Sequence, residues 1–324
     1  MKNNEIIYDF QEHLSSEFPS QIVIDVTEQC NLACIHCPHE EFSKSDYYKG
    51  RHLDTGLNKK LVDETAADGY PFCKYLRYTA QGEPFIHPNL IEMLEYAVKF
   101  SKTSVNVTTN GKILTKEKAS ALLETGVNVI DISIDAHKDE TYAAIRKKGN
   151  LKETRFNVLQ LIELKKKKKY QSKIVVSYVE QELNRDETND FEKFWKEAGA
   201  NYVVIRRMHS CAGAKPEKAK EMRSQQITRK PCLYPWERLV LEPSGYIGFC
   251  PADWLGKSKI TNFENTSIKN IWQGDFMNNL RKAHLENDFK DHSFCGLCPD
   301  WAAMRWPNEG RAYSDMMQEF SDKK

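Results

Sequence analysis

VTEQCNLACIHCPHE, the stretch from Val26 to Glu40, places three cysteines, Cys30, Cys34 and Cys37, within eight residues. It begins at the last residue of a short apolar run, residues 22–26, which is typical of a buried strand. A polar loop at the carboxyl end of a parallel strand is where the active sites of barrel enzymes are built. The spacing C-x3-C-x2-C therefore predicts a metal or redox centre directly after the first strand.

The number of ligands in this stretch limits which metal it can hold. Structural zinc usually takes four protein ligands, and only His36 and His39 could supply a fourth here. His36 lies between two cysteines and would have to fold back. Three cysteines suit an iron–sulfur cluster with one iron open to an external ligand.

The composition narrows the class of protein. The 324 residues suffice for one large domain or two ordinary ones. The 47 basic side chains nearly balance the 46 acidic ones, which argues against a nucleic acid or a membrane as partner. No signal peptide and no transmembrane run is apparent, so we expect a cytoplasmic protein. Disulfides are rare there, and the nine cysteines need another use.

Short β-branched runs alternate with helical patterns over the first two thirds of the chain. Helix-period segments cover residues 89–100, 115–126 and 187–199, and the last two end in Gly126 and Gly199, at plausible helix C-caps. Successive βα units predict an α/β fold with a parallel sheet curled into a partial or full barrel. The expected strands are residues 22–26, 75–79, 104–108, 127–134, 174–179 and 202–206.

The pattern changes after this region. Residues 210–231 are polar and aperiodic, which predicts a linker or active-site loop. From Cys232 onward the chain holds five of the six tryptophans, a hairpin-like segment with its turn at 243–245, and a helix over 268–287. We therefore expect an N-terminal extension (1–20), a barrel (21–209), the linker (210–231), a small second domain (232–310) and a tail (311–324).

The second domain has its own set of cysteines, Cys232, Cys250, Cys295 and Cys298, in the spacing C-x17-C-x44-C-x2-C. A module of about 80 residues has a thin core, and a metal centre would help to hold it together. Four thiolates can bind zinc or an iron–sulfur cluster, and composition alone slightly favours zinc.

The stretch CNLACIHC resembles the signature of radical S-adenosylmethionine (SAM) enzymes, whose fold is a partial (β/α)6 TIM-like barrel. The resemblance implies that Cys30, Cys34 and Cys37 hold a [4Fe–4S] cluster and that SAM chelates the open iron. Reductive cleavage of SAM then gives a 5′-deoxyadenosyl radical, with a flavodoxin- or ferredoxin-type reductant as partner. His36 stands where many members carry an aromatic residue beside the cluster.

Four later segments also resemble family motifs that surround SAM. TAQGEPFIHP is similar to the GGE motif and implies Gln81, Gly82 and Glu83 near the SAM ammonium, although QGEP alone also fits an ordinary strand-to-helix turn. VTTNG and ISIDA imply that Asn110, Ser133 and Asp135 line the SAM pocket. Ser133 and Asp135 are two residues apart, so we expect them on one strand face. YAAIRKKGN implies that Arg146 reaches the SAM ribose or carboxylate, and a surface charge is the alternative.

The second cysteine set resembles the auxiliary-cluster extension called SPASM in its full form and twitch in its short form. The full form uses seven cysteines, and none follows Cys298 here, so the resemblance implies one auxiliary [4Fe–4S] cluster with four protein ligands. The spacing resembles that of a twitch dehydrogenase that oxidises a cyclitol alcohol to a ketone. A fully ligated cluster cannot easily bind substrate and would accept an electron.

Several other side chains are candidates for work on the substrate. Arg206 and Arg207 end the last predicted strand, and since adjacent strand residues face opposite sides, we expect one of them in the barrel mouth. Cys211 could return a hydrogen atom, as a thiol does in radical SAM epimerases, or be a plain loop residue. His209 follows the two arginines closely, and Glu180 and Gln181 are weaker candidates. Cys73 is expected to be a buried free thiol.

Three functions remain open at this point. The first is a radical SAM oxidoreductase that dehydrogenates a small hydroxylated substrate such as a sugar or aminocyclitol. The second is a peptide-modifying maturase or epimerase; many of these carry a leader-binding domain before the barrel, where this chain has 20 residues. The third is a non-enzymatic zinc-binding protein.

Overall fold

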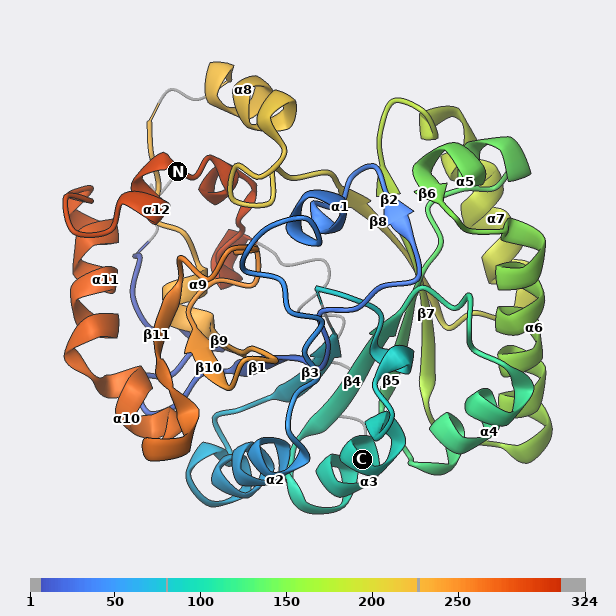
Figure 1. The fold of residues 1–324 in the computed structure, drawn as a ribbon, viewed down its shortest axis with the longest axis horizontal. Coiled ribbons are helices and arrows are strands. Elements are labelled where there is room, and N and C mark those ends of the chain that lie inside the picture. Colours follow the sequence, from blue (N-terminus) through green and yellow to red (C-terminus); the bar gives the residue numbers. More distant parts are fainter. Residues whose placement is uncertain (1–6, 80, 226–227, 310–324) are drawn as a thin grey trace, which may run out of the picture.

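The fold is organised by one large sheet, seen in the computed structural model, which describes residues 7–79, 81–225 and 228–309 (Figure 1). In this part of the chain the sheet has nine strands in the order β11-β10-β9-β1-β3-β4-β5-β7-β8. Six consecutive members of it are parallel and confirm the predicted strands: β1 (Gln21–Asp25), β3 (Tyr75–Thr79), β4 (Ser104–Thr109), β5 (Val129–Ser133), β7 (Lys173–Glu180) and β8 (Tyr202–Arg207).

Helices connect these strands and cover one face of the sheet (Figure 1). The principal connecting helices are α2 (Thr55–Glu64), α3 (Leu90–Phe100), α4 (Lys116–Glu124), α6 (Leu151–Lys168) and α7 (Thr188–Ala198). Gly126 and Gly199 follow α4 and α7 with φ of 76° and 98°, the left-handed conformation that glycine adopts at a helix end. The result is the predicted partial (β/α)6 barrel, open beyond β8.

Side chains alternate between the two faces of each barrel strand. On β1, Ile22 and Ile24 are buried in the main core beneath the helices, while Gln21, Val23 and Asp25 face the barrel interior and line a cleft. The deepest part of the interior is apolar and is formed by Tyr75, Val129 and Val175. Toward the carboxyl ends of the strands the interior becomes polar, and it is there that a ligand can bind.

The C-terminal segment continues the barrel sheet. Strand β9 (Arg238–Leu241) pairs in parallel with β1, and β10 (Tyr246–Gly248) and β11 (Lys259–Asn262) extend the sheet in antiparallel fashion. Gly245 has φ of 79° in the predicted hairpin turn, where a left-handed residue is required. The pairing of β9 with β1 was not anticipated from the sequence, since these strands lie more than two hundred residues apart.

Two helical expectations differ from the structure. The helix predicted over 268–287 is divided into α10 (Ile268–Gln273) and α11 (Asp275–Glu286) by Gly274, whose backbone is extended. The segment predicted to be irregular contains α8 (Pro216–Ser224), which begins with a proline at its first position. Shorter helices are α1 (His39–Phe42), α5 (Asp139–Ile145), α9 (Tyr234–Glu237) and α12 (Ser293–Leu297). The expected tail, residues 311–324, lies outside the described residues.

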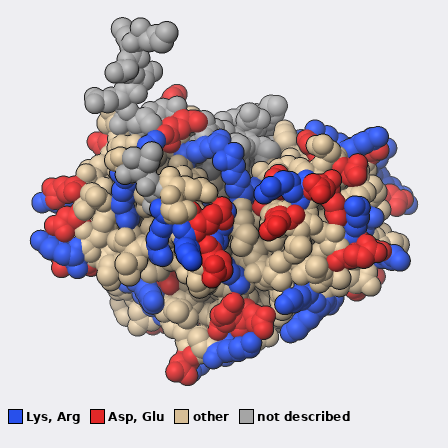
Figure 2. All heavy atoms as spheres, turned by 90° about the horizontal axis from the view of Figure 1, so that it is seen from above, with Lys and Arg blue, Asp and Glu red and all other residues tan. Residues whose placement is uncertain are grey.

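The surface carries charges of both signs. On the face shown in Figure 2, lysines and arginines are interspersed with aspartates and glutamates, in keeping with a formal net charge of +1. Among the described helices, none is long and apolar enough to cross a membrane.

Candidate functional site

The first cysteine set lies in the loop between β1 and α1. Within it β2 (Ala33–Cys34) pairs with β6 (Arg146–Lys147), so that Cys34 stands opposite Arg146. Burial raises the pKa of all three thiols, to about 11 for Cys30. Repulsion from Cys34, Cys211 and Cys30 raises the pKa of Cys37 further. By contrast, Cys73 is buried beside β3 and hydrogen-bonds the Tyr75 carbonyl oxygen, as expected for a structural thiol.

Gly82 and Gln81 connect the end of β3 to other parts of the site. A Cβ atom on Gly82 would lie 2.0 Å from the carbonyl oxygen of Gln29. Glycine is therefore needed here so that this turn can pack against the backbone just before Cys30. The Gln81 side chain donates a hydrogen bond of 2.6 Å to the Asp253 carbonyl oxygen in the C-terminal module. QGE is thus more than an ordinary strand-to-helix turn, because it contacts both the cysteine loop and the second module.

Glu83 and Asn110 hold the carboxyl end of β4 against the cysteine loop. The buried Glu83 carboxylate accepts hydrogen bonds from the Thr109 hydroxyl (2.6 Å) and the Asn110 backbone N–H (2.8 Å). Burial raises the pKa of Glu83, and these donors oppose the rise. The Asn110 amide donates to the side-chain oxygen of Asn31, next to Cys30, at 2.7 Å.

Asp135 and Arg146 form a buried ion pair beside the cysteine loop. The Arg146 Nε donates to Asp135 Oδ2 at 2.9 Å, and the Val179 backbone N–H donates to Oδ1 at 2.7 Å. Arg146 is 4% exposed, so the alternative of a surface charge is wrong. The expected shared face of Ser133 and Asp135 is also wrong, because β5 ends at Ser133 and Asp135 has a left-handed φ of 64°. Ser133 remains partly accessible at the strand end.

His36 connects this ion pair to a large cleft. Its Nε2 lies 3.5 Å from Asp135 Oδ2, and its Nδ1 is buried without a hydrogen-bond partner in the described structure. Burial lowers the pKa of His36 to about 4, although Asp135 opposes this shift. A neutral imidazole therefore lines the cleft next to Cys37.

The cleft has a volume of about 560 Å³ and lies between the barrel interior and the C-terminal module. Both Arg206 and Arg207 line it, against the expectation that only one would face the mouth. The Arg206 guanidinium lies 2.5 Å from Asp131 Oδ2 and 3.2 Å from the Ser177 hydroxyl, while Arg207 is exposed. Of the weaker candidates, Glu180 pairs with Arg185 at 3.7 Å. The described residues that line the cleft include Val179 of β7 but neither Glu180 nor Gln181.

Cys211 lies on a turn beside the first cysteine loop and also lines the cleft. Its φ is 53°, and its Sγ lies 3.9 Å from the His36 carbonyl oxygen. The Asp300 carboxylate anchors this turn by accepting from the Ser210 and Ala212 backbone N–H groups at 2.8 and 2.6 Å. His209, also on the turn, lies 3.5 Å from Asp300. The turn therefore joins the first cysteine site to the residues around Cys298.

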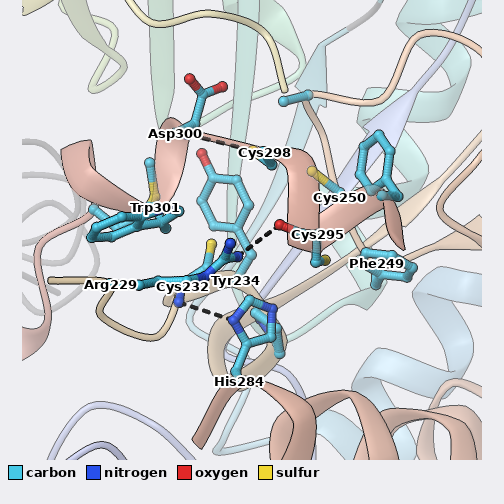
Figure 3. Close-up of a pocket in the computed structure, with 14 residues that line it drawn as sticks. Arg229, Cys232, Tyr234, Phe249, Cys250, His284, Cys295, Cys298, Asp300 and Trp301 are labelled. Carbon is cyan, nitrogen blue, oxygen red and sulfur yellow. Dashed lines mark hydrogen bonds between the residues drawn. The ribbon is translucent and has the colours of Figure 1, made fainter. Parts of the chain in front are cut away.

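The second cysteine set surrounds a cavity of about 30 Å³, lined by Cys232, Cys250, Cys295 and Cys298 (Figure 3). Burial raises the pKa of all four thiols, and repulsion among them raises those of Cys232 and Cys250 further. Arg229 holds α12 in place by donating to the carbonyl oxygens of Cys295 and Gly296. In the part of the chain that is described, no three Cys, His, Asp or Glu side chains are close enough to hold a single metal ion. Four sulfurs spread around one small cavity fit a four-iron cluster.

A thin wall separates this cavity from the cleft. Tyr234, Ala252 and Met304 line both of them. The guanidinium of Arg238 stacks 4.2 Å from the Tyr234 ring centroid. A molecule in the cleft would therefore lie between Cys37 on one side and the cavity of the second cysteine set on the other.

Several lining residues were missed at the level of the sequence. Asp25 ends β1 inside the cleft, Arg77 stands on β3 beside it, and Tyr234 forms part of the wall. One signal was available for Asp25: it continues the Gln21–Val23 alternation on the polar face of an otherwise apolar strand. The wall residues had no such signal, because they depend on how the C-terminal module packs.

Comparison with known proteins finds one match in the barrel and another in the C-terminal module. Residues 24–194, more than half of the chain, match the profile of the Radical SAM superfamily. Residues 232–299 match SPASM, described as an iron–sulfur cluster-binding domain. A cofactor-modifying protein for tungsten-containing aldehyde ferredoxin oxidoreductase from Pyrococcus furiosus is 31% identical over 116 residues, which are 35% of this chain and 30% of that protein. The matched region thus spans less than a third of that relative.

Two solved structures share the fold over most of the chain. BtrN in complex with AdoMet and 2-DOIA has a TM-score of 0.56 at 19% identity, covering 86% of this chain and 92% of BtrN. Streptococcus suis SuiB bound to precursor peptide SuiA has a TM-score of 0.67 at 13% identity, covering 94% of this chain and 74% of SuiB.

Proposed function

Because the chain belongs to the radical SAM superfamily and carries a SPASM domain, we propose that it dehydrogenates a small hydroxylated substrate. The two matched domains indicate a SAM-binding [4Fe–4S] cluster, SAM and an auxiliary iron–sulfur cluster as cofactors. We assign the first cluster to Cys30, Cys34 and Cys37. The auxiliary [4Fe–4S] cluster is assigned to Cys232, Cys250, Cys295 and Cys298. When bound, SAM and its cluster supply a 5′-deoxyadenosyl radical, and the auxiliary cluster takes up an electron.

One observation carries the proposal: the cleft touches the first cysteine site and shares a wall with the cavity of the second. Cys37 and His36 line one part of it, and Tyr234, which also lines the auxiliary cavity, lines another. Oxidation of an alcohol to a ketone removes a hydrogen atom, a proton and an electron. A substrate in this cleft can lose its hydrogen atom on one side and its electron on the other.

The polar groups of the cleft favour a hydroxylated substrate. The side-chain Nε2 of Gln21 and the Nδ1 of His36 are both buried without a partner in the described structure. Both line the cleft. A buried polar atom left without a hydrogen bond is costly, so a ligand that satisfies these atoms gains affinity. A hydroxyl group both donates and accepts, and it can satisfy either atom.

The other predicted residues are assigned by where they lie. Gln81, Gly82, Glu83, Asn110, Ser133, Asp135 and Arg146 are proposed to shape the SAM site. Arg206 and Arg207 are proposed to anchor the substrate from the floor and rim of the cleft. Cys211, which lines the same cleft, is proposed to meet a substrate radical. A flavodoxin- or ferredoxin-type reductant and a cytoplasmic location remain predictions from the sequence.

The experiment uses a panel of polyols labelled with deuterium at their carbinol carbons: 2-deoxy-scyllo-inosamine, myo-inositol and glucosamine. Each is incubated anaerobically with the holoenzyme, SAM and dithionite, and 5′-deoxyadenosine is analysed by mass spectrometry. Deuterium in 5′-deoxyadenosine together with a ketone product supports the proposal. If no polyol transfers deuterium, the dehydrogenase proposal is wrong, and labelled peptides then test the maturase alternative.

A further inference from the structure

Asp25 occupies a distinctive place in the cleft. It is the last residue of β1, and the chain continues from it directly into the loop of the first cysteine site. Its side chain lines the same cleft as His36 and Cys37. It therefore stands at the carboxyl end of a barrel strand, where residues that act on a substrate are found.

The Asp25 carboxyl group is buried, and no described residue forms a hydrogen bond or ion pair with it. The residue is 5% exposed. Across residues 7–79, 81–225 and 228–309, no hydrogen bond or ion pair reaches its carboxylate. The other buried carboxylates of the site are satisfied: Glu83, Asp131 and Asp135 each accept at least two hydrogen bonds. An unpartnered carboxyl group that faces a cleft is available to a ligand.

Its surroundings make the Asp25 carboxylate a stronger proton acceptor than an ordinary aspartate. Burial and repulsion from Glu242, which follows β9, raise the pKa of Asp25 to about 8, although Arg77 on β3 opposes the rise. Glu242 is held by the Tyr47 and Ser244 hydroxyls and lies 3.6 Å from Lys259. The other charged or titratable groups lining the cleft are Arg206, Arg207, Arg238, Arg305, His36, Cys37, His209, Cys211, Tyr75 and Tyr234.

We propose that Asp25 is the catalytic base that takes the hydroxyl proton of the substrate. This rests on the dehydrogenase function proposed above. The carbinol hydrogen leaves as an atom to the 5′-deoxyadenosyl radical that SAM supplies. The O–H bond breaks with its proton passing to the Asp25 carboxylate, the C=O double bond forms, and the remaining electron goes to the auxiliary cluster. Carbon is oxidised by two electrons, one of which leaves with the hydrogen atom.

The first test separates hydrogen-atom transfer from proton transfer. It uses the polyol that passes deuterium to 5′-deoxyadenosine, with wild type, Asp25→Asn and Asp25→Glu. We expect Asp25→Asn to keep its iron and to make deuterated 5′-deoxyadenosine, while ketone formation falls by about 10²–10⁴-fold, the usual contribution of a general base. Asp25→Glu should recover part of the ketone yield. Ketone formation by Asp25→Asn at the wild-type rate would overturn the proposal, as would equal loss of deuterium transfer and ketone.

The pH profile gives a second and more specific readout. A base must be ionised, so kcat/KM of the wild type should rise with pH and level off above about 8. Glu242→Gln removes a negative charge beside Asp25 and should move this profile to lower pH without abolishing turnover. If the pH profile of kcat/KM in Glu242→Gln is the same as in wild type, the assignment is contradicted. It is also contradicted if both Asp25→Glu and Asp25→Asn keep the wild-type profile.

A third readout needs no substrate. The raised pKa means that folded Asp25 holds its proton at a pH where the unfolded chain, with an ordinary value of 3.8, has released it. The contribution of Asp25 to the free energy of unfolding is thus most favourable below about pH 4, and it is lost as the pH rises toward about 8. As the pH rises over this range, the melting temperature of the Asp25→Asn holoenzyme should increase relative to that of wild type. A variant less stable than wild type at every pH would assign Asp25 a structural role instead.

These readouts distinguish the two proposals. Absence of deuterium transfer from every polyol in wild type refutes the dehydrogenase function, and the Asp25 base with it. Deuterium transfer and ketone formation in wild type with an unaffected Asp25→Asn variant refute only the role of Asp25.

Discussion

Gly82 lies against the backbone of Gln29 so closely that a Cβ atom on it would stand 2.0 Å from the Gln29 carbonyl oxygen. The Gly82 N–H donates to the Thr27 carbonyl oxygen at 3.2 Å, and the Glu83 N–H donates to that of Gln29 at 2.7 Å. The turn after β3 thereby fixes the backbone that leads into Cys30. The position of the first cysteine depends on a residue with no side chain.

Gly82→Ala should therefore disrupt the first iron–sulfur site. The added methyl group meets backbone atoms, which cannot rotate away, so the loop before Cys30 must shift. We expect anaerobically reconstituted protein to lose roughly half of its iron, because the auxiliary site is unaffected. Iron analysis and the absorbance of the clusters measure this.

Gly126→Ala is the matched control. Gly126 has a positive φ, and among the described residues an added Cβ there meets only Val98, at 3.6 Å. Alanine in this conformation should cost about 1 kcal/mol of stability and no iron. Full iron content in Gly82→Ala would show that the close approach to Gln29 is not required.

Arg146→Met should destabilise the protein by about 3–5 kcal/mol, since it leaves the buried Asp135 carboxylate without its cation. Arg146→Lys keeps the charge and should lose less. The control is Arg185→Met, which breaks the exposed pair with Glu180 and should cost at most about 1 kcal/mol. Chemical unfolding of the three variants measures the differences, and equal effects for Arg146→Met and Arg185→Met would contradict the buried pair.

His87 should contribute to acid sensitivity. Its Nε2 lies 2.9 Å from the Leu53 carbonyl oxygen, and its Nδ1 accepts from the Asn89 N–H at 3.1 Å, so both nitrogens are used in the neutral form. Burial lowers the pKa of His87 below its ordinary value of 6.5. The unfolded chain therefore takes up the proton first, and this residue's stabilisation is lost as pH falls below about 6.5.

The measurement compares wild type with His87→Gln as a function of pH. Near neutral pH the variant should be less stable than wild type by a roughly constant amount, about 1 kcal/mol, because its hydrogen bonds are altered. The gap between the two stability curves should then narrow as the pH falls. Parallel curves from neutral to acidic pH would show that His87 does not titrate on unfolding.

The sequence was most informative where a signal is local. The barrel strands were predicted because each is a short β-branched run between helical patterns. The cysteine sets were identified because their spacing is compact near Cys30 and ends in C-x2-C at Cys298. Gly126 and Gly199 marked helix ends because a left-handed residue is required at those positions.

What the sequence could not provide depends on contacts between distant segments. The pairing of β9 with β1 has no local signal, and neither does the wall formed by Tyr234 and Met304. Asp135 leaves the strand in a left-handed conformation, which the two-residue period of a strand does not describe. For Asp25 the alternation with Gln21 and Val23 indicates only a shared strand face, and the state of its carboxyl group depends on segments far away in the sequence.

The central claim is a division of labour between two clusters, the first producing the radical and the second accepting the substrate electron. Anaerobic incubation of wild type, Cys34→Ala and Cys232→Ala with SAM, dithionite and the labelled polyol tests it most directly, with 5′-deoxyadenosine and ketone both quantified. We predict both products from wild type, neither from Cys34→Ala, and 5′-deoxyadenosine without ketone from Cys232→Ala. Formation of 5′-deoxyadenosine by Cys34→Ala, or of ketone at the wild-type rate by Cys232→Ala, would contradict it.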